Sequence, residues 1–408
     1  MPTGASRFPD LRLERLTKLI ERFTADPSLV LMNLFGTSNA ESDQIKWESQ
    51  MGNRGMTPFV APGAEAPTTA PPGVAEHRAS AAFWKEKIPY GEEFLNNLRQ
   101  PGTVETYMPA QKRLARDLRM LRNRCDRRKE WMFAQMITSG SVDYINPHGI
   151  RASWDYEIPA SQKVTLASSR HWDTGSNRNI LEDIMDAKLV LKNSIGATID
   201  YALFTSELLK YMILDTGIQT ILAKSAFGQG DLFARPIEVL GSLLDIQNMV
   251  LYDEQYQIKA WLTAVVTGAS TTAVSVDDAS DFEAGATLRF WDVSAGTYED
   301  ETIASVDVDA GTVTVDTAPT ASFKAGEDVV TMTKKFLPTT KFCMFASSVE
   351  GQRIAEFMSA PFSIPRQWGM KVDSHEEWDP EVVWIRVQNK GLPVLYQQDG
   401  IYNLTVMD

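Results

Sequence analysis

Residues 109–139, PAQKRLARDLRMLRNRCDRRKEWMFAQMITS, are the stretch that decides the fold. Pro109 suits the first turn of a helix, and Gly140 suits the position just after its end. At about 1.5 Å per residue, the predicted helix is roughly 45 Å long, which is the width of a whole domain. Apolar residues recur along one of its faces at helical spacing, namely Leu114, Leu118, Leu121, Cys125, Met132 and Met136.

Two segments without an evident local partner precede this helix. Residues 10–35 are predicted to form a helical N-terminal arm with an apolar second piece after Pro27. Residues 44 to about 90 are predicted to be extended on both sides of residues 55–74, which hold five of the chain's 20 prolines. Because such a stretch forms neither a helix nor a central strand, we predict a long two-armed loop. A loop of this length in a compact domain is usually functional or disordered.

The chain after Gly140 mixes strands and helices, which indicates an α+β fold. We expect strands at 153–158 and 163–168, helices at about 179–194 and 205–214, a buried strand at 197–203, and a strand-rich segment at 382–406.

Residues 264–333 form an acidic block with an internal repeat. Thirteen acidic and two basic residues give the block a net charge of −11, out of −13 for the whole chain. The sequence VSVDDA at 274–279, with FEAG at 282–285, recurs as VTVDTA at 313–318, with FKAG at 323–326. Alternating apolar and polar residues between turn residues predict short strands. We therefore expect an inserted all-β module facing water, with a core of Val274, Val276, Phe282, Leu288, Val313, Val315 and Phe323.

Length and composition restrict the class of protein. With 408 residues, of which 43% are hydrophobic, the chain can form two or three globular domains. Cys125 and Cys343 lie far apart without a neighbouring cysteine or histidine, so neither a disulfide framework nor a zinc site is expected. No segment resembles a signal peptide or a membrane span, which predicts a soluble protein made in a reducing cytoplasm.

The sequence gives no indication of an enzyme, and we expect neither a cofactor nor a metal. The motifs GxSxG, GxxxxGK[ST] and HExxH are missing, as is a GxGxxG that opens a helix. A catalytic or metal-binding histidine would need partners, yet the four histidines lie in four different segments, namely His77, His148, His171 and His375.

Two groups of carboxylates have a functional and a simpler interpretation. Glu376, Glu377 and Asp379 could supply a general acid and base or a cation site, but Pro380 favours a solvated turn. Residues 307–311, DVDAG, resemble the start of a calcium loop but lack its final glutamate at the required spacing. Solvated turns explain both groups.

The predicted helix carries nine cations between residues 112 and 129. They could contact the phosphates of a nucleic acid, or they could form a solvated face and ion pairs. A nucleic-acid-binding protein acting through helix 112–129 is therefore an alternative, and the acidic module suggests a cell-surface binding protein as a third. The arm, the loop and the long helix all expose surface that a monomer leaves uncovered, which favours assembly.

The order of several short strings resembles the major capsid protein E family of tailed bacteriophages, the lambda-like major capsid proteins. These strings are LVLMNLF at 29–35, TSG at 138–140, LPVL at 392–395, DGI at 399–401 and LTV at 404–406, and Asp379-Pro380 precedes LPVL in the tail segment. The resemblance covers about residues 10–263 and 334–408. It implies the Hong-Kong-97-like major capsid fold, into which the small all-β domain is inserted.

The resemblance also implies a division of the chain into the parts of that fold. The expected parts are an N-arm at 1–43, an E-loop at 44–100, a peripheral domain at 101–178 with the spine helix at 109–139, an axial domain at 179–263, the inserted acidic β domain at 264–333, the return of the axial domain at 334–369, and the C-terminal strands of the peripheral domain at 370–408.

The function implied is that of a non-enzymatic major capsid protein. Copies of the chain would form hexamers and pentamers of an icosahedral shell around double-stranded DNA, with the β domain on the outer surface. The implied partners are a scaffolding protein, a portal, the packaged DNA and a decoration protein, and no membrane is involved. The protein would be made in the host cytoplasm and would reside in the virion. No covalent crosslink is predicted. Subunit contacts are expected at Leu29, Leu31, Phe35, Trp47, Phe59, Phe83, Trp84, Arg113, Arg116, Arg119 and Arg122.

Overall fold

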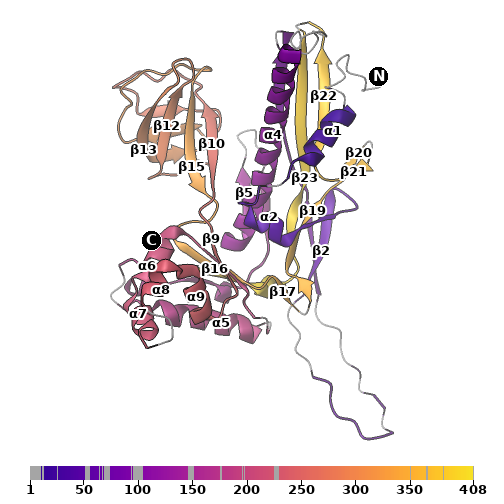
Figure 1. The fold of residues 1–408 in the computed structure, drawn as a ribbon, viewed down its shortest axis with the longest axis vertical. Coiled ribbons are helices and arrows are strands. Elements are labelled where there is room, and N and C mark those ends of the chain that lie inside the picture. Colours follow the sequence, from indigo (N-terminus) through magenta and orange to yellow (C-terminus); the bar gives the residue numbers. More distant parts are fainter. Residues whose placement is uncertain are drawn as a thin grey trace. The chain divides into compact units, whose positions relative to one another are not determined.

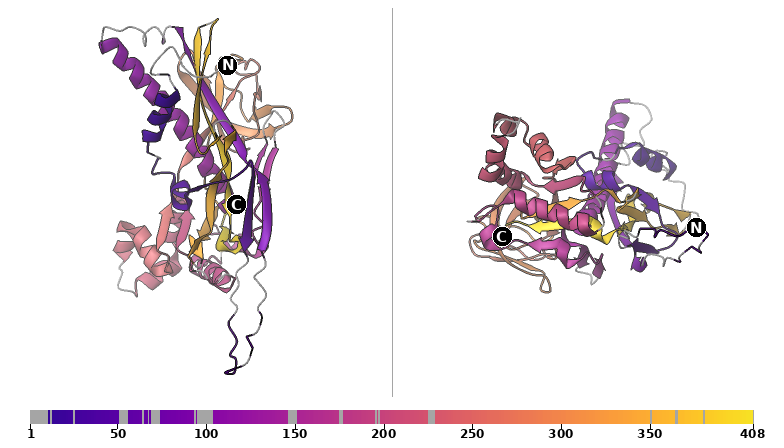
Figure 2. Two further views of the ribbon diagram at one scale, coloured as in Figure 1. Left: turned by 90° about the vertical axis from the view of Figure 1, so that its right-hand side faces the viewer. Right: turned by 90° about the horizontal axis from the view of Figure 1, so that it is seen from below.

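The computed structural model divides the chain into two compact units (Figures 1 and 2). The first unit comprises Met1–Gly140, Tyr156–Leu251 and Thr340–Asp408, and the second comprises Ser141–Asp155 and Tyr252–Thr339. The structure describes the chain apart from residues 1–10, 12, 25, 51–55, 64, 67, 69–73, 93, 95–103, 146–150, 175–176, 195, 197, 225–228, 350, 364–365, 380 and 408.

The long helix of the first unit, α4 (Val104–Ser139), has 36 residues and begins five residues before its predicted start. Pro109 consequently lies in the second turn, where it removes one backbone hydrogen bond, and not in the first turn. The helix ends as predicted at Gly140, whose φ of +75° suits glycine and whose N–H donates to the carbonyl oxygen of Met136 (3.1 Å).

A five-stranded sheet lies beside α4 (Figure 2). Its central strand, β23 (Val382–Leu395), pairs antiparallel with β4 (Ala82–Gly91) along one edge. Along the other edge it pairs with β22 (Lys371–Glu377) and β19 (Ala355–Ser359), and β19 pairs with β1 (Thr37–Asn39). Side chains of this sheet pack with α4 and with the N-terminal helix α1 (Leu13–Arg22) in one buried cluster.

This sheet changes two expectations. The predicted loop at 44–100 includes β4, which is a ten-residue strand of the main sheet because β23 offers it a full antiparallel partner. Glu376 and Glu377 belong to β22, paired with Val383 and Val382, so the solvated turn expected there was wrong for both glutamates.

A second sheet of the first unit is covered by short helices. Its strands are, in spatial order, β7 (Lys163–Thr165), β24 (Ile401–Thr405), β16 (Lys341–Phe345), β8 (Tyr201–Phe204) and β9 (Asn248–Leu251). The helices are α5 (Ile180–Ser194), α6 (Ser206–Ile213), α7 (Thr216–Leu222), α8 (Gln229–Ala234) and α9 (Pro236–Leu244). The last strand, β24, lies in this sheet, although the resemblance grouped it with the peripheral strands.

The remaining elements are short. The second arm helix is α2 (Val30–Phe35), and three-residue 3₁₀ turns lie at Ala160–Gln162, Ser168–Arg170 and Gln398–Gly400. Hairpins are formed by β2 (Gln44–Gln50) with β3 (Val74–Ser80), β17 (Ser348–Val349) with β18 (Gln352–Arg353), β20 (Phe362–Ser363) with β21 (Arg366–Gln367), and, in the second unit, β5 (Ser141–Ile145) with β6 (Arg151–Asp155).

The second unit contains a six-stranded β-barrel (Figure 1). Its strands are β10 (Gln255–Trp261), β15 (Val329–Lys335), β12 (Thr287–Asp292), β13 (Thr297–Asp307), β14 (Thr312–Val315) and β11 (Ala273–Ser275), in spatial order. The ends of β10 and β11 close the ring, since the N–H of Thr263 donates to Ser275 O and the N–H of Asp277 donates to Trp261 O (both 3.0 Å). All seven predicted core residues lie in its buried cluster.

The two copies of the sequence repeat occupy equivalent places in the barrel. Val274 and Val313 are direct partners across β11 and β14. The N–H of Gly285 donates to Ile303 O, and the N–H of Gly326 donates to Leu262 O, both at 2.7 Å. The barrel is therefore a duplication in which β10, β11 and β12 correspond to β13, β14 and β15. Its strands span residues 255–335, which is wider than the predicted 264–333 because each half contributes three strands.

Candidate assembly surfaces

The N-terminal arm is held on α4 by charged side chains at both of its helices. Arg122 donates from Nη1 to the carbonyl oxygens of Ile20 and Phe23 at the end of α1. The carbonyls of a last helical turn lack partners within the helix and carry partial negative charge, which a guanidinium neutralises. Arg122 also pairs with Asp126 one turn further along α4 (3.4 Å).

Glu130 provides the opposite interaction at α2. Its carboxylate is buried and accepts hydrogen bonds from the N–H groups of Leu31 (3.0 Å) and Met32 (2.7 Å). These are amides of the first turn of α2, whose preceding residue, Leu29, provides no side-chain cap. The long helix therefore supplies an anion to the start of α2 and a cation to the end of α1, as the two helix dipoles require.

Two further charges of α4 are buried close to these contacts. Burial raises the pKa of Asp126, against the opposing effect of Lys129 and Arg122. Burial also lowers the pKa of Lys129, whose ammonium lies 5.1 Å from the ring centre of Phe357. Sequence analysis missed Asp126 and Glu130, although Arg122, Asp126 and Glu130 follow one another at four-residue intervals and therefore share one helix face.

The predicted contact residues of the arm lie inside their own chain. Leu29, Leu31 and Phe35 are each 1% exposed. Phe35 stacks on Phe133 (ring centres 5.3 Å apart) and contacts Phe345 (5.6 Å). Their role within the subunit is to fix the arm to α4 and β16.

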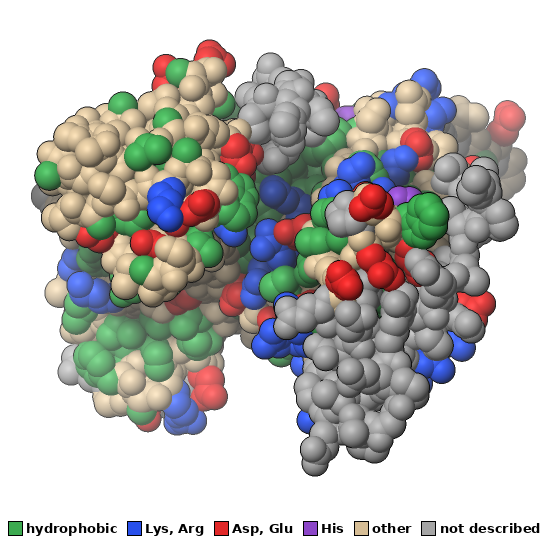
Figure 3. All heavy atoms as spheres, turned by 90° about the horizontal axis from the view of Figure 1, so that it is seen from above, with side chains coloured by type: hydrophobic (Ala, Val, Ile, Leu, Met, Phe, Trp, Pro, Cys, Tyr) green, Lys and Arg blue, Asp and Glu red, His purple; other side chains and the backbone are tan. Residues whose placement is uncertain are grey.

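The cations of α4 differ from one another in their surroundings. Arg124 pairs with Glu86 of β4 (2.7 Å), and Arg119 lies over the ring of Phe23. Arg113 and Arg116 lie near Asp117 with 62% and 79% of their side chains exposed. On the face shown in Figure 3, Lys and Arg side chains lie beside Asp and Glu side chains.

The loop between β2 and β3 is anchored at its base and exposed at its tip. Trp47 is buried, stacked on His77 (5.4 Å) and beside Tyr156 (6.4 Å). His77 Nε2 lies 2.7 Å from Ser49 Oγ and 3.2 Å from Gln398 Nε2. Between the two strands, Met56 and Phe59 are fully exposed. The segment that connects the paired strands β2 and β3 thus presents two large apolar side chains to solvent.

The β4 residues Phe83 and Trp84 face opposite sides of the sheet. Trp84 packs edge-on against Phe357 (6.2 Å), whereas Phe83 is half exposed and contacts Phe362 (6.3 Å). Phe83 borders a surface hollow of about 490 Å³ with Ser42, Asp43, Pro361, Phe362, Arg366 and Lys390.

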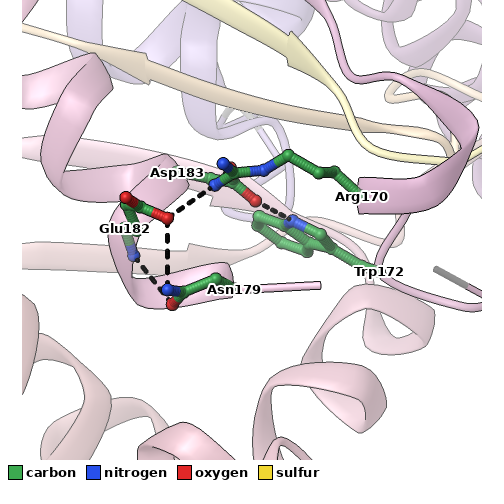
Figure 4. A network of polar contacts seen from close by, with 5 residues as sticks. All are labelled: Arg170, Trp172, Asn179, Glu182 and Asp183. Atoms are coloured by element: carbon green, nitrogen blue, oxygen red, sulfur yellow. Dashed lines mark hydrogen bonds and ion pairs between the residues drawn. The ribbon is translucent and has the colours of Figure 1, made fainter. Parts of the chain in front are cut away.

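A polar network that sequence analysis did not find fixes the segment before α5 (Figure 4). Asp183 accepts hydrogen bonds from Trp172 Nε1 (3.1 Å) and Arg170 Nη2 (2.5 Å). Glu182 accepts from Arg170 (3.0 Å) and Asn179 (3.2 Å). Burial raises the pKa of Asp183, although the bonds from Trp172 and Arg170 act in the opposite direction. The network has a structural role, because its hydrogen bonds hold Arg170 and Trp172 against the first turn of α5.

Among the described residues, no three His, Cys, Asp or Glu side chains are placed to hold a metal ion. His77, His171 and His375 belong to separate elements, and His148 lies outside the described residues. The carboxylate of Asp307 accepts from the N–H of Ala310 (2.9 Å), which is a turn contact. Both cysteines are free, and burial raises the pKa of each to about 12. In the described part of the chain, no helix has the length and apolar character to cross a membrane.

Of the eleven predicted contact residues, five are exposed in the subunit: Phe59, Phe83, Arg113, Arg116 and Arg119. Trp84 and Arg122 are partly buried, and the other four are buried within the chain. That these residues touch a neighbouring subunit stays a prediction.

Comparisons with known proteins agree with the geometry of a shell subunit. Residues 13–293 match the family model of phage major capsid protein E. A putative capsid protein of a prophage from E. coli CFT073 is similar in structure, with a TM-score of 0.53 and 11% identity over 97% of this chain and 98% of that chain. A phage-related protein from Bordetella bronchiseptica RB50 has a TM-score of 0.50 and 11% identity over 95% of both chains. No curated protein matched the sequence. Because the family model covers well over half of the sequence, the chain belongs to the phage major capsid protein E family and is a shell-forming capsid protein.

Proposed function

We propose that copies of this chain assemble as hexamers and pentamers into the icosahedral head that encloses the double-stranded DNA of a tailed phage. The family match over residues 13–293 carries the proposal. Scaffolding protein, portal, packaged DNA and a decoration protein are the partners such a head would use, and the subunit has no catalytic role. Electron microscopy of the purified protein tests this, since closed shells are expected and small oligomers alone would contradict it.

Within this proposal the elements correspond to the parts of a Hong-Kong-97-like subunit. The arm with α1 and α2 is the N-arm, β2 and β3 with their loop are the E-loop, and α4, about 54 Å long, is the spine helix. The five-stranded sheet beside α4 is the peripheral domain, and the sheet covered by α5 to α9 is the axial domain. The barrel is the inserted domain.

We expect the tip of the E-loop to contact a neighbouring subunit. Replacing Met56 and Phe59 with serine should leave the stability of the subunit unchanged, because both side chains are fully exposed. The same change should reduce the yield of shells at least about tenfold, since apolar anchors dominate contact energies. Sedimentation velocity measures both shells and free subunits. Val293→Ser, at an exposed apolar position of the barrel, is the matched control, and equal shell yields for the two variants would contradict the assignment.

We further propose that the barrel lies on the outer surface of the shell. Residues 264–333 carry a net charge of −11, and on the inner face packaged DNA would repel that charge wherever the two lie within about 8 Å, the distance beyond which salt screens them.

Removal of the barrel should leave a subunit that assembles. Tyr256 and Lys334 are direct partners across β10 and β15, so a short Gly/Ser linker can replace residues 257–333. Deletion of 264–333 is the control, because it leaves most of β10 without its partner β15 and should cause aggregation. Loss of soluble protein in the 257–333 variant would show that the barrel is required for folding.

A further inference from the structure

The outer face of the barrel carries a row of aromatic side chains across four adjacent strands. Trp261 of β10 is the partner of Val329 of β15, Val329 is the partner of Trp291 of β12, and Trp291 is the partner of Tyr298 of β13. Residues that pair directly across strands point to the same face. Since Ala260, Phe290 and Val330 belong to the core, their neighbours Trp261, Trp291 and Val329 point outward.

Both ends of the aromatic row are open to solvent. Trp261 and Tyr298 are 42% and 53% exposed. Val329 between the two indoles is only 4% exposed, although it points away from the core. Neighbouring side chains must therefore cover it. The rings of Trp291 and Tyr298 lie 5.1 Å apart, which extends the surface to the fourth strand.

A row of polar side chains lies alongside the aromatic row, two residues before it in β10 and β12 and two residues after it in β15 and β13. Lys259 has its ammonium 4.4 Å from the ring centre of Trp261, and Arg289 lies 4.1 Å from that of Tyr298. Arg289 also donates from Nε and Nη2 to both carboxylate oxygens of Asp300, each at 2.7 Å. The bidentate pair restricts the guanidinium and thereby preorganises the edge of the aromatic row.

In the other half of the duplication, none of the positions equivalent to these rings is aromatic. The pair Trp291–Tyr298 corresponds to Thr333–Gln257 in the other half, and the pair Trp261–Val329 corresponds to Thr302–Thr287. The two halves share an apolar interior, with Leu262 and Ile303 at equivalent places. The positions equivalent to the three rings carry threonine and glutamine side chains. The rings therefore serve a purpose besides the pairing of strands.

We propose that this aromatic row binds a neutral polysaccharide, with sugar rings stacked on Trp261, Trp291 and Tyr298 and hydroxyl groups bonded to Arg289 and Asp300. The inference concerns the barrel alone and goes beyond shell formation. A sugar ring has an apolar face and a hydroxyl-bearing rim, which matches aromatic rings with polar groups along one edge.

The dimensions and charge of the row favour a polymer of sugars over other partners. The indoles lie two strands apart, about 10 Å, which is the length of a disaccharide, and Tyr298 adds a further strand spacing. A protein partner needs a contact of about 800 Å² with an apolar centre, whereas this row is one side chain wide with polar residues beside it. The net charge of −11 on residues 264–333 repels nucleic acids and acidic polysaccharides.

The test measures depletion of the full-length protein from solution by cellulose, chitin, starch and galactomannan. The test variant is Trp261→Thr, Trp291→Thr and Tyr298→Gln, which copies the counterpart residues of the other half and so preserves the fold. The control is Thr302→Ala with Thr333→Ala at the equivalent positions. We expect binding of the wild type to at least one of the four polymers, a loss of at least about tenfold in the test variant, and a change of less than about twofold in the control.

Two results would overturn the proposal. One is a wild type that none of the four polymers retains, or that is retained equally after the triple substitution. The other is retention only on a poly-lysine resin that depends on the three rings, which would identify the row as a docking site for a basic protein. Hydrogen exchange at residues 255–335 of each variant shows whether the barrel remains folded, because the protection of its strand amides does not depend on the substituted rings.

Discussion

Replacing Glu130 with alanine is expected to lower the free energy of unfolding of the subunit by about 3 kcal/mol. Glu130 is fully buried and accepts hydrogen bonds from the N–H groups of Leu31 and Met32. Alanine leaves both amides without these bonds and removes the anion from the start of α2. Chemical denaturation of the unassembled subunit measures the loss. Hydrogen exchange at residues 30–35 should rise at the same time, because α2 would detach from α4.

The matched control for this prediction is Glu130→Gln. Glutamine keeps the shape and one carbonyl oxygen, so it can accept one of the two bonds but without charge. We expect about half of the destabilisation of the alanine variant. If Glu130→Ala and Glu130→Gln were both as stable as the wild type, the contact between α4 and the arm would be without energetic importance.

The long helix and the repeat could be predicted from the sequence because both are local patterns. The apolar face of residues 109–139 identifies the helix, and the repeated Val274 and Val313 become direct partners in the barrel. The resemblance, which rested on the order of short strings, led to the family that the comparison over residues 13–293 shows.

The aromatic row and the partners of the arm could not be predicted in this way. Trp261 and Trp291 are thirty positions apart, and only the register of β10, β15 and β12 brings them to one row. Leu29 and Phe35 looked like exposed apolar residues because their partners, such as Phe133 and Phe345, are distant in the sequence. A run of apolar residues therefore indicates that these side chains become buried. It does not indicate whether the same chain or a neighbouring subunit covers them.

The buried charges of α4 show a related limit. From the sequence alone, the cations of α4 are interpreted as one basic surface. Its function could be phosphate binding or subunit contact. In the structure, Arg122 contacts the carbonyl oxygens of α1 and pairs with Asp126, whereas Arg119 is exposed three residues earlier. Arg122, which holds the arm, and Arg119, which is accessible to partners, are thus only three residues apart on the same helix.

Arg122→Glu is consequently expected to destabilise the subunit by about 4 kcal/mol, the range for loss of one partner of a buried ion pair. The new carboxylate would face Asp126, whose side chain is 6% exposed, and the carbonyl oxygens of Ile20 and Phe23. All of these groups repel it. The arm should detach, and both thermal stability and shell yield should fall.

Arg119→Glu provides the comparison, because it makes the same change of charge one turn away. Its side chain is exposed and loses only a contact with the ring of Phe23, so stability should change by less than about 1 kcal/mol. Thermal denaturation and sedimentation velocity of the two variants separate the effects. If Arg119→Glu alone abolished shells while Arg122→Glu remained as stable as the wild type, the basic face of α4 would act between subunits and not in holding the arm. The structure instead predicts that Arg122→Glu is the destabilised variant of the two, since the guanidinium of Arg122 contacts the end of α1 and that of Arg119 does not.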